Sequence, residues 1–519
     1  MMTIDKALWM PLIFAFLCLI PSPKRITRLT FIAGAVISAI GAWGFVFGAS
    51  WSPRVFAFNG NLMMDALSAV FALLITGVGV LSAVYAGGYL FKEGDGSISP
   101  LRLRRYACFF HLFLFTMLLT VFSNNLGIMW IAIEGTTLAS AFLVNVDDKK
   151  SSIEAAWKYL ILCSVGISLA LFGIILVYYS AIAQAASGES GLLLNWTFLL
   201  SKAKQLDPQV LRLAFIFILV GYGTKAGLAP FHSWLPDAHS QAPAPVSALL
   251  SGVLLSCATL GILRFHILTK AATGSAFSDT LLIFFGVLSV VVATPFILEQ
   301  KDYKRLLAYS SVEHMGLAAA GLGFGGALGL YGAILHIMNH AFTKSLLFFS
   351  SGHLYYLFHS KEIADVKGLL RKNAFLGIIF FLAALAIAGM PPFSIFVSEF
   401  LILSAGFLGG KYISCAVLLL FLALIFVGFL RHASRMTLGG PNTNQSKQSG
   451  DWGRPNYHFG KEIKSLGGSE EPPKVERSLL MDSVLVVGMI VILTMGFYIP
   501  GPLNALIQAA GRIAGGTIL

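Results

Sequence analysis

The chain has 519 residues, of which 57% are hydrophobic and only 12% are charged. Soluble domains carry roughly twice that share of charged residues, so the composition excludes a soluble globular protein. The net charge of +12 does not indicate nucleic-acid binding, because the Lys and Arg residues fall mainly in a few short loops, as membrane insertion requires.

Apolar runs long enough to cross a bilayer recur along nearly the whole chain. They predict an all-α polytopic membrane protein with about fourteen transmembrane helices. In chain order, we expect spans at residues 4–20, 29–48, 64–91, 106–122, 125–144, 153–180, 208–228, 243–268, 279–299, 304–324, 328–350, 373–407, 411–431 and 479–499. The first run lacks a small-residue cleavage site, so we interpret it as a retained helix rather than a signal peptide.

The loops between these spans alternate in charge. Basic residues follow spans one, three, five, nine and eleven: Lys24, Arg25, Arg28, Lys92, Arg102, Arg104, Arg105, Lys149, Lys150, Lys301, Lys304, Arg305, Lys361, Lys367, Arg371 and Lys372. The positive-inside rule places these loops in the cytoplasm. It predicts a multi-pass protein of the plasma or inner membrane with both termini outside, on the periplasmic side.

A long polar segment, 432–478, separates the last two spans. It is rich in Gly, Ser, Asn and Pro and has few aliphatic residues. This composition is typical of a flexible linker, which the charge pattern places in the cytoplasm. A docking site for a partner is the alternative.

The five cysteines all lie in apolar runs, far apart and without a Cys-x-x-Cys pair: Cys18, Cys108, Cys163, Cys257 and Cys415. This is the pattern of small core residues, and it offers no ligand set for an iron–sulfur cluster or a nickel site. We therefore expect no cofactor, no metal site and no redox centre belonging to this chain.

The sequence contains an internal repeat. Residues 227–237, GLAPFHSWLPD, align with residues 389–399, GMPPFSIFVSE. Span seven is predicted to run inwards and span twelve outwards, so the two Gly/Pro-interrupted segments have opposite orientations. Such a pair indicates an inverted-repeat transporter with broken helices.

Three ionisable residues lie in apolar surroundings. Glu134 is in span five, Lys225 is in span seven just before its break, and Glu399 follows the apolar run 374–390. A charge in lipid is costly, so each is a functional hypothesis by default. Carboxylates and amines spread over several helices favour a proton or ion path over a site for an organic substrate. The alternatives are a structural ion pair for Glu134 and a lysine that reaches back to the interface for Lys225.

Span eleven carries His336, His340 and Lys344, which recur every four residues and so share one helix face. Three protonatable groups on one stripe predict a proton relay, for which histidine is suited near neutral pH. A structural polar network is the alternative. A metal site would need more ligands than this stripe offers.

Further candidates lie near the predicted cytoplasmic surface. Lys158 follows Glu154 by one helical turn, so an interfacial ion pair competes with a channel role. His232, Asp237 and His239 belong to the segment PFHSWLPDAHSQAPAP. They either line a cytoplasmic half-channel or cap the broken helix ends.

Four long strings carry a family resemblance: GTKAGLAPFHSWLPDAHSQAPAPVSALLSG, KRLLAYSSVEHMG, LHIMNHAFTKSLLFFSSGH and AGMPPFSIFVSEFLIL. They resemble the antiporter-like subunits of respiratory complex I and their Mrp-antiporter and membrane-hydrogenase relatives, over about residues 60–435. The stretches FHLFLFTMLLTVFSNNLGIMWIAIEGTTLASAFLV and EAAWKYLILCSVG look most like the hydrogenase-4 component F family of formate-hydrogenlyase-type complexes.

The resemblance implies fourteen helices with two inverted five-helix repeats and broken helices 7 and 12. The implied domains are residues 1–105 (helices 1–3), 106–268 (helices 4–8), 279–431 (helices 9–13), 432–478 (the polar loop) and 479–519 (helix 14 and tail). It also implies proton translocation coupled to a redox arm with nickel–iron or iron–sulfur subunits, reached through other membrane subunits of the complex.

Carried over residue by residue, the resemblance pairs Glu134 with Lys225. It makes His336, His340 and Lys344 the relay and Glu399 the exit carboxylate. This sequence departs from the pattern in span eight, where many relatives hold a lysine or histidine and this chain has Ser256. Serine hydrogen-bonds but does not store a proton, so water would have to bridge the gap.

Together these features predict a proton-translocating subunit of a hydrogenase-4-like membrane complex. The alternatives are a non-pumping scaffold of that complex, a cation/proton antiporter, or a module of an inorganic-carbon uptake complex.

Overall fold

The computed structural model describes residues 4–48, 54–91, 98–184, 190–274, 276–439 and 478–516. Apart from a hairpin of strands β1 (Val55–Ala57) and β2 (Leu62–Met64), these ranges are mainly helical. The helices are α1 (Ile4–Leu17), α2 (Lys24–Gly48), α3 (Ala66–Tyr89), α4 (Pro100–Phe122), α5 (Leu126–Val144), α6 (Lys150–Ile182), η1 (Ser190–Leu192), α7 (Trp196–Ser201), η2 (Ala203–Gln205), α8 (Pro208–Ala226), α9 (Trp234–Gln241), α10 (Ala244–Leu249), η3 (Leu250–Leu254), α11 (Leu255–Thr273), α12 (Phe277–Leu298), α13 (Tyr303–Phe324), α14 (Gly326–Phe358), α15 (Leu369–Lys372), α16 (Ala374–Ile387), α17 (Ser394–Leu408), α18 (Tyr412–Leu438), α19 (Leu479–Phe497) and α20 (Gly501–Ala514).

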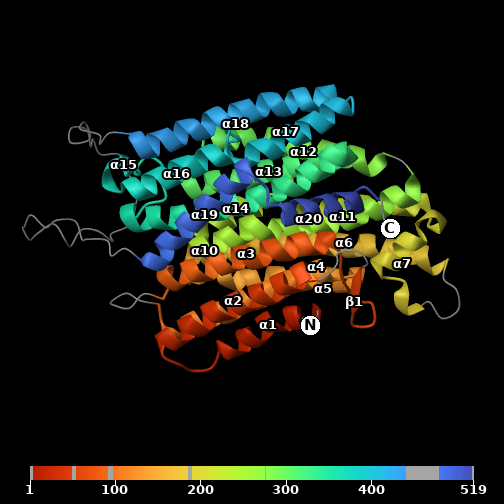
Figure 1. The fold of residues 1–519 in the computed structure, drawn as a ribbon, viewed down its shortest axis with the longest axis horizontal. Coiled ribbons are helices and arrows are strands. Elements are labelled where there is room, and N and C mark those ends of the chain that lie inside the picture. The colour runs from red at the N-terminus through yellow and green to blue at the C-terminus, as the bar shows by residue number, and fades with distance from the viewer. Residues whose placement is uncertain are drawn as a thin grey trace, which may run out of the picture.

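The long helices lie side by side along the longest axis of the molecule (Figure 1). In the described part of the chain, ten helical stretches are long and apolar enough to cross a membrane. Helices α13 and α14 fall outside this set, although both bury most of their residues, because they carry the polar side chains discussed below. The prediction of an all-α polytopic membrane protein is confirmed. The number fourteen and the inverted repeats stay predictions.

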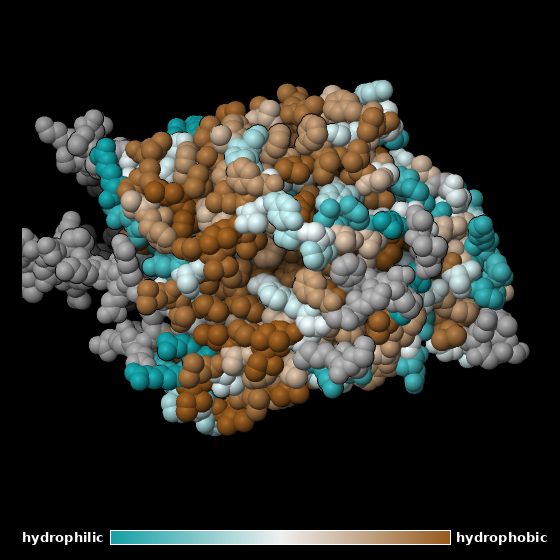
Figure 2. Space-filling model, viewed as in Figure 1, coloured by the Kyte–Doolittle hydropathy of each residue, from teal (hydrophilic) through white to brown (hydrophobic). Residues whose placement is uncertain are grey.

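The surface is that of a protein surrounded by lipid. Figure 2 shows hydrophobic residues across the middle of one face and hydrophilic residues gathered towards its two ends. Helix α6 exposes Ile161, Val165 and Phe172, and α18 exposes Leu420 and Val427. Large exposed side chains in such number are typical of a membrane interface rather than a water-facing surface.

Both predicted helix breaks are present. Helix α8 ends at Ala226, and Gly227 follows with a φ of 78°. Helix α16 ends at Ile387, and Gly389 has a φ of 76°. This left-handed backbone favours glycine, and the prolines that follow cannot continue a helix. The breaks put Lys225 and Glu399 next to non-helical backbone inside the molecule.

Two features differ from the sequence prediction. Helix α18 continues to Leu438, beyond the expected boundary at 431, because His432, Ala433, Met436 and Thr437 are buried against the helices. The remainder of the predicted polar loop, 440–477, lies outside the described residues. Span eight is also not one regular helix: a π-helical turn, η3, separates α10 from α11.

Candidate functional site

The first cluster of buried polar residues lies where α5, α6 and α8 meet, and consists of Glu134, Thr137, Tyr159, Ser164 and Lys225. Lys225 is fully buried, two residues before the α8 break. Its Nζ donates hydrogen bonds to Thr137 Oγ1 at 2.8 Å and to Tyr159 OH at 2.7 Å. A buried ammonium group is costly unless it is hydrogen-bonded, and these two hydroxyl oxygens meet that need.

Glu134 does not touch Lys225. It is partly exposed and accepts hydrogen bonds from Ser164 Oγ at 2.6 Å and from Thr137 Oγ1 at 3.3 Å. Within the described ranges, neither Lys225 nor Lys344 has a carboxylate oxygen at ion-pair distance. In place of the direct pairing expected from the sequence, Thr137 stands between the two charges, accepting from Lys225 and donating to Glu134. Sequence analysis missed this threonine.

The α8 break is held by its own hydrogen bonds. Trp234 Nε1 donates to the carbonyl oxygen of Thr224 at 2.8 Å, and the Gly227 N–H donates to the same oxygen at 3.3 Å, so this carbonyl group near the helix end is satisfied. A Cβ atom at Gly227 would lie 2.7 Å from the Leu235 side chain. These hydrogen bonds and this close packing hold Lys225 at the end of α8.

Lys158 and Asp237 belong to an exposed network rather than to the buried cluster. Lys158 Nζ lies 2.6 Å from Glu154 Oε1 and 3.6 Å from Asp237 Oδ2. Asp237 also pairs with Arg305 at 2.9 Å. For Lys158 this arrangement matches the alternative of an ion pair at the membrane interface. Asp237 joins α9 to both α6 and α13.

The two histidines of the same segment are buried. His232 is mostly buried, and its ring lies edge-on to Tyr309. His239 is fully buried and stacks on Phe348 with ring centroids 4.9 Å apart. Neither ring nitrogen of His239 has a hydrogen-bond partner in the protein, so this side chain caps no helix end.

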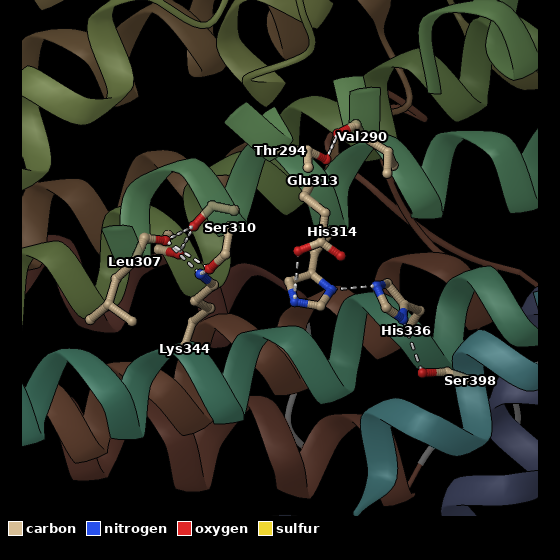
Figure 3. Close-up of polar contacts among 11 residues, drawn as sticks. Val290, Thr294, Leu307, Ser310, Glu313, His314, His336, Lys344 and Ser398 are labelled. Carbon is tan, nitrogen blue, oxygen red and sulfur yellow. Dashed lines mark hydrogen bonds and ion pairs between the residues drawn. The ribbon is translucent and has the colours of Figure 1, made fainter. Parts of the chain in front are cut away.

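The second cluster lies between α13, α14 and α17, and Figure 3 shows most of it. It consists of Ser310, Glu313, His314, His336, His340, Lys344, Ser398 and Glu399. His336, His340 and Lys344 are all fully buried. Lys344 Nζ donates to the carbonyl oxygen of Leu307 at 2.5 Å and contacts Ser310 Oγ.

The hydrogen bonds of this cluster cross between helices and do not run along α14. His336 Nε2 lies 3.2 Å from His314 Nδ1, and His336 Nδ1 lies 3.0 Å from Ser398 Oγ. His340 has no hydrogen-bond partner on either nitrogen, and its ring centroid is 5.4 Å from that of His314. His336 therefore bonds to α13 and α17 and Lys344 to α13 alone, and in the described chain no hydrogen bond joins the three residues of the α14 stripe to one another.

Sequence analysis missed Glu313 and His314. Glu313 Oε2 lies 3.4 Å from His314 Nε2, and both residues are 1% exposed. Glu313, His314 and Glu399 each place one polar atom within 4.8 Å of the others. The short distances alone do not make these three side chains metal ligands. The signal was present, because Glu313 is a carboxylate in the apolar stretch VEHMGLAAAG, the same criterion that singled out Glu134.

Ser256 lies in α11 and is buried. Its Oγ donates to the carbonyl oxygen of Gly252 at 3.2 Å, the back-bonding that serines in membrane helices commonly show. The hydroxyl proton is therefore used within the helix, and only the lone pairs of the oxygen remain for a water molecule.

A buried ion pair outside both clusters also escaped sequence analysis. Arg264 of α11 donates to both carboxylate oxygens of Asp65, at 2.6 and 2.8 Å, and its guanidinium group lies 4.4 Å from the Trp196 ring centroid. Both side chains are at most 3% exposed. This two-point contact joins the start of α3 to α11.

Comparison with known proteins identifies the family. The family model described as "NADH:quinone oxidoreductase/Mrp antiporter, TM" matches residues 123–426, more than half of the chain. The chain belongs to this antiporter family. The model of the N-terminus of complex I chain 5 matches residues 51–98. By this match the chain is a multi-pass membrane subunit of the complex I, Mrp and hydrogenase type. Both clusters of this antiporter-like subunit lie within residues 123–426.

Among the relatives is the hydrogenase-4 component F homolog of Methylacidiphilum infernorum, 44% identical over 346 residues, which are 66% of this chain and 72% of that protein. Hydrogenase-4 component B of Escherichia coli is 29% identical over 72% of the antiporter-like subunit, which spans only 56% of that protein's length. The fold matches the membrane-bound sulfane sulfur reductase, an archaeal respiratory membrane complex, with a TM-score of 0.80 at 24% identity, covering 99% of this chain and 97% of that one.

Proposed function

We propose that this antiporter-like subunit translocates protons across the membrane within a hydrogenase-4-like or formate-hydrogenlyase-like complex. The observation that carries the proposal is the setting of Lys225 and Lys344. Both are fully buried, and both are held by hydroxyl and carbonyl oxygens rather than by a carboxylate. Because an unpaired buried charge is costly, a small movement of a nearby carboxylate decides whether each lysine keeps its proton.

In this mechanism, Glu134 is the input. It is a partly exposed member of the first cluster, so a neighbouring subunit can reach it. A redox-driven shift in that neighbour moves Glu134 relative to Thr137 and so changes the field at Lys225. Lys225 then releases or takes up a proton, and the second cluster passes it towards Glu399. The chain supplies an electrostatic switch between Glu134 and Lys225, and the other subunits supply the redox chemistry.

The first test asks whether Glu134 and Thr137 affect proton translocation through the same contact, the hydroxyl of Thr137 that lies between Glu134 and Lys225. Glu134→Gln should reduce redox-linked proton translocation, and Thr137→Val should do the same, because it removes the hydroxyl that joins the two charges. If both act through one bridge, the double variant should lose less than the sum of the two losses. Translocation is measured by a pH dye in proteoliposomes at matched assembly. Thr120→Val is a control, because Thr120 is a buried hydroxyl that bonds only within α4. Additive losses would show that Glu134 does not act on Lys225 through Thr137.

A specific observation favours the scaffold alternative. Ser256 back-bonds to its own helix, so the link between the two clusters depends on water finding the free lone pairs of that oxygen. We expect Ser256→Leu to slow proton translocation by drying this route and Ser256→Lys to support it. Thr259→Val is the matched control, because Thr259 also back-bonds within α11. Wild-type rates in Ser256→Leu would show that the path avoids span eight or that the subunit does not conduct.

We further propose that both termini lie outside and that residues 440–477 lie in the cytoplasm, as the alternating basic loops favour. A protease site inserted at residue 455 should resist cleavage from the periplasmic side of intact cells and be cut in inside-out vesicles. The same site placed at the C-terminus should show the reverse pattern. Cleavage at 455 from outside would overturn this topology and the inverted-repeat argument with it.

A further inference from the structure

A cavity of about 470 Å³ lies outside both clusters. It is formed where α12 ends, where α18 ends and along the segment that joins α14 to α15. Its cationic lining consists of Lys301, Lys367 and Arg435, and Glu362 is the one carboxylate among the described residues that line it. None of the three cations forms an ion pair with a described residue. The cavity therefore has an excess of positive charge that the described chain does not neutralise.

One wall of the cavity contains a buried nitrogen without a partner. His432 of α18 lines the cavity and is 5% exposed. Its Nε2 lies 3.1 Å from the carbonyl oxygen of Ile297 and 3.2 Å from that of Leu298. A carbonyl oxygen only accepts, so Nε2 carries the hydrogen and caps the end of α12. Nδ1 then has no hydrogen-bond partner in the protein. Because an unpaired buried nitrogen is costly, a group bound in the cavity would supply the partner that Nδ1 lacks.

Backbone contacts hold the walls of the cavity in place. The Ile363 N–H donates to the carbonyl oxygen of Lys301 at 2.7 Å, which fixes the segment after α14 against the end of α12. A Cβ atom at Gly368 would lie 3.3 Å from the carbonyl oxygen of Gly439, so the start of α15 packs closely against the end of α18. The cations of these segments therefore surround one space without a rearrangement of the chain.

The surface beside the cavity is apolar. Helix α12 exposes Phe296, and α18 exposes Leu424, Val427 and Leu438. Both helices are long and apolar enough to cross a membrane. A basic pocket between membrane helices is typical of a site for the headgroup of an anionic lipid. The segment 440–477 carries six basic and five acidic residues, so its charge does not favour it as the occupant.

We propose that this cavity binds the phosphate group of an anionic phospholipid, whose acyl chains lie along the apolar surfaces of α12 and α18. Lys301, Lys367 and Arg435 supply positive charge to the phosphate. The doubly protonated ring of His432 donates through Nδ1 to a phosphate oxygen and keeps its Nε2 bonds to α12. This site is independent of proton translocation. Under the topology proposed above, the lipid belongs to the cytoplasmic leaflet.

The test titrates phosphatidylglycerol into the intact complex in a neutral detergent and follows the tightest-bound lipid by native mass spectrometry. A Lys or Arg near the membrane surface contributes about 5-fold to the binding of an anionic lipid, so Lys301→Gln with Lys367→Gln should weaken binding by about 25-fold. The matched control is Arg371→Gln with Lys372→Gln. It removes the same charge from exposed positions of α15 that do not line the cavity, and it should bind with the wild-type affinity.

His432→Gln tests the unpaired nitrogen separately. Glutamine places an amide N–H near the position of Nε2, so it keeps a donor for the carbonyl groups of α12 and loses Nδ1. We expect the affinity for phosphatidylglycerol to fall by about 10-fold, as for the loss of one hydrogen bond to a charged group. The thermal stability of the subunit should not change. Wild-type affinity in His432→Gln or in the double lysine variant would overturn the site.

Two further results distinguish the lipid from other occupants. Inorganic phosphate that competes with phosphatidylglycerol at equal affinity would indicate a site for a soluble anion and would overturn the lipid. A photo-crosslinking residue in place of Ala364, which lines the cavity, should capture phosphatidylglycerol, and capture of a neighbouring subunit would overturn the proposal as well. Redox-linked proton translocation should stay at the wild-type rate in all of these variants, so a failure of the lipid site and a failure of the proposed function are observed separately.

Discussion

Replacing Lys225 by alanine is expected to reduce redox-linked proton translocation by roughly 100-fold, the lower range for removing a positioned proton carrier. Lys225 joins the first cluster through Thr137 and Tyr159, and the part of the chain that the structure describes places no second ammonium group in this cluster. Alanine leaves both hydroxyls without their donor but removes the buried charge, so the complex should still assemble. The initial rate of lumen acidification is measured against the rate of the redox reaction.

The control for Lys225→Ala is Lys411→Ala. Lys411 is exposed at the start of α18 and lies outside both clusters. Its loss should leave both the redox rate and acidification unchanged. Acidification at the wild-type rate in Lys225→Ala, with full redox turnover, would favour a scaffold that retains buried charges without using them.

Replacing Arg264 by alanine is expected to destabilise the subunit by about 3–5 kcal/mol, because it leaves the Asp65 carboxylate buried and unpaired. The two side chains are at most 3% exposed and share two hydrogen bonds. Unfolding of the subunit in detergent, followed by denaturant or heat, measures the loss.

Two comparisons make the Arg264 result specific. The double variant Arg264→Met with Asp65→Leu should recover most of the stability, since replacing both partners by apolar groups is often neutral. Lys270→Met breaks the more exposed pair with Asp279 and should change stability by only about 0–1 kcal/mol. An Arg264→Ala loss no larger than that of Lys270→Met would show that water reaches the Asp65 site.

The sequence predicted those features that leave a strong local signal. Gly227 and Gly389, each followed by proline, marked both helix breaks, because their backbone requirements are local. Lys225 and Glu399 stood out because a charge in an apolar run is costly wherever it faces. The class of protein followed from apolar length alone.

Interactions between helices left no such signal. Thr137 bridges Glu134 to Lys225, yet a threonine in a membrane helix commonly bonds to its own backbone, so its type does not reveal the role. Periodicity on one helix grouped His336, His340 and Lys344, whereas the hydrogen bonds of His336 reach His314 on α13 and Ser398 on α17. The π-helical turn η3 also has no distinctive composition.

The central claim is that this chain itself carries protons. Its most direct test is the number of protons translocated per electron pair by the intact complex in proteoliposomes, with the wild-type chain and with Lys344→Ala. The account predicts that this ratio falls in Lys344→Ala, while electron transfer continues and Lys411→Ala keeps the wild-type ratio. An unchanged ratio in Lys344→Ala, at full assembly, would contradict it.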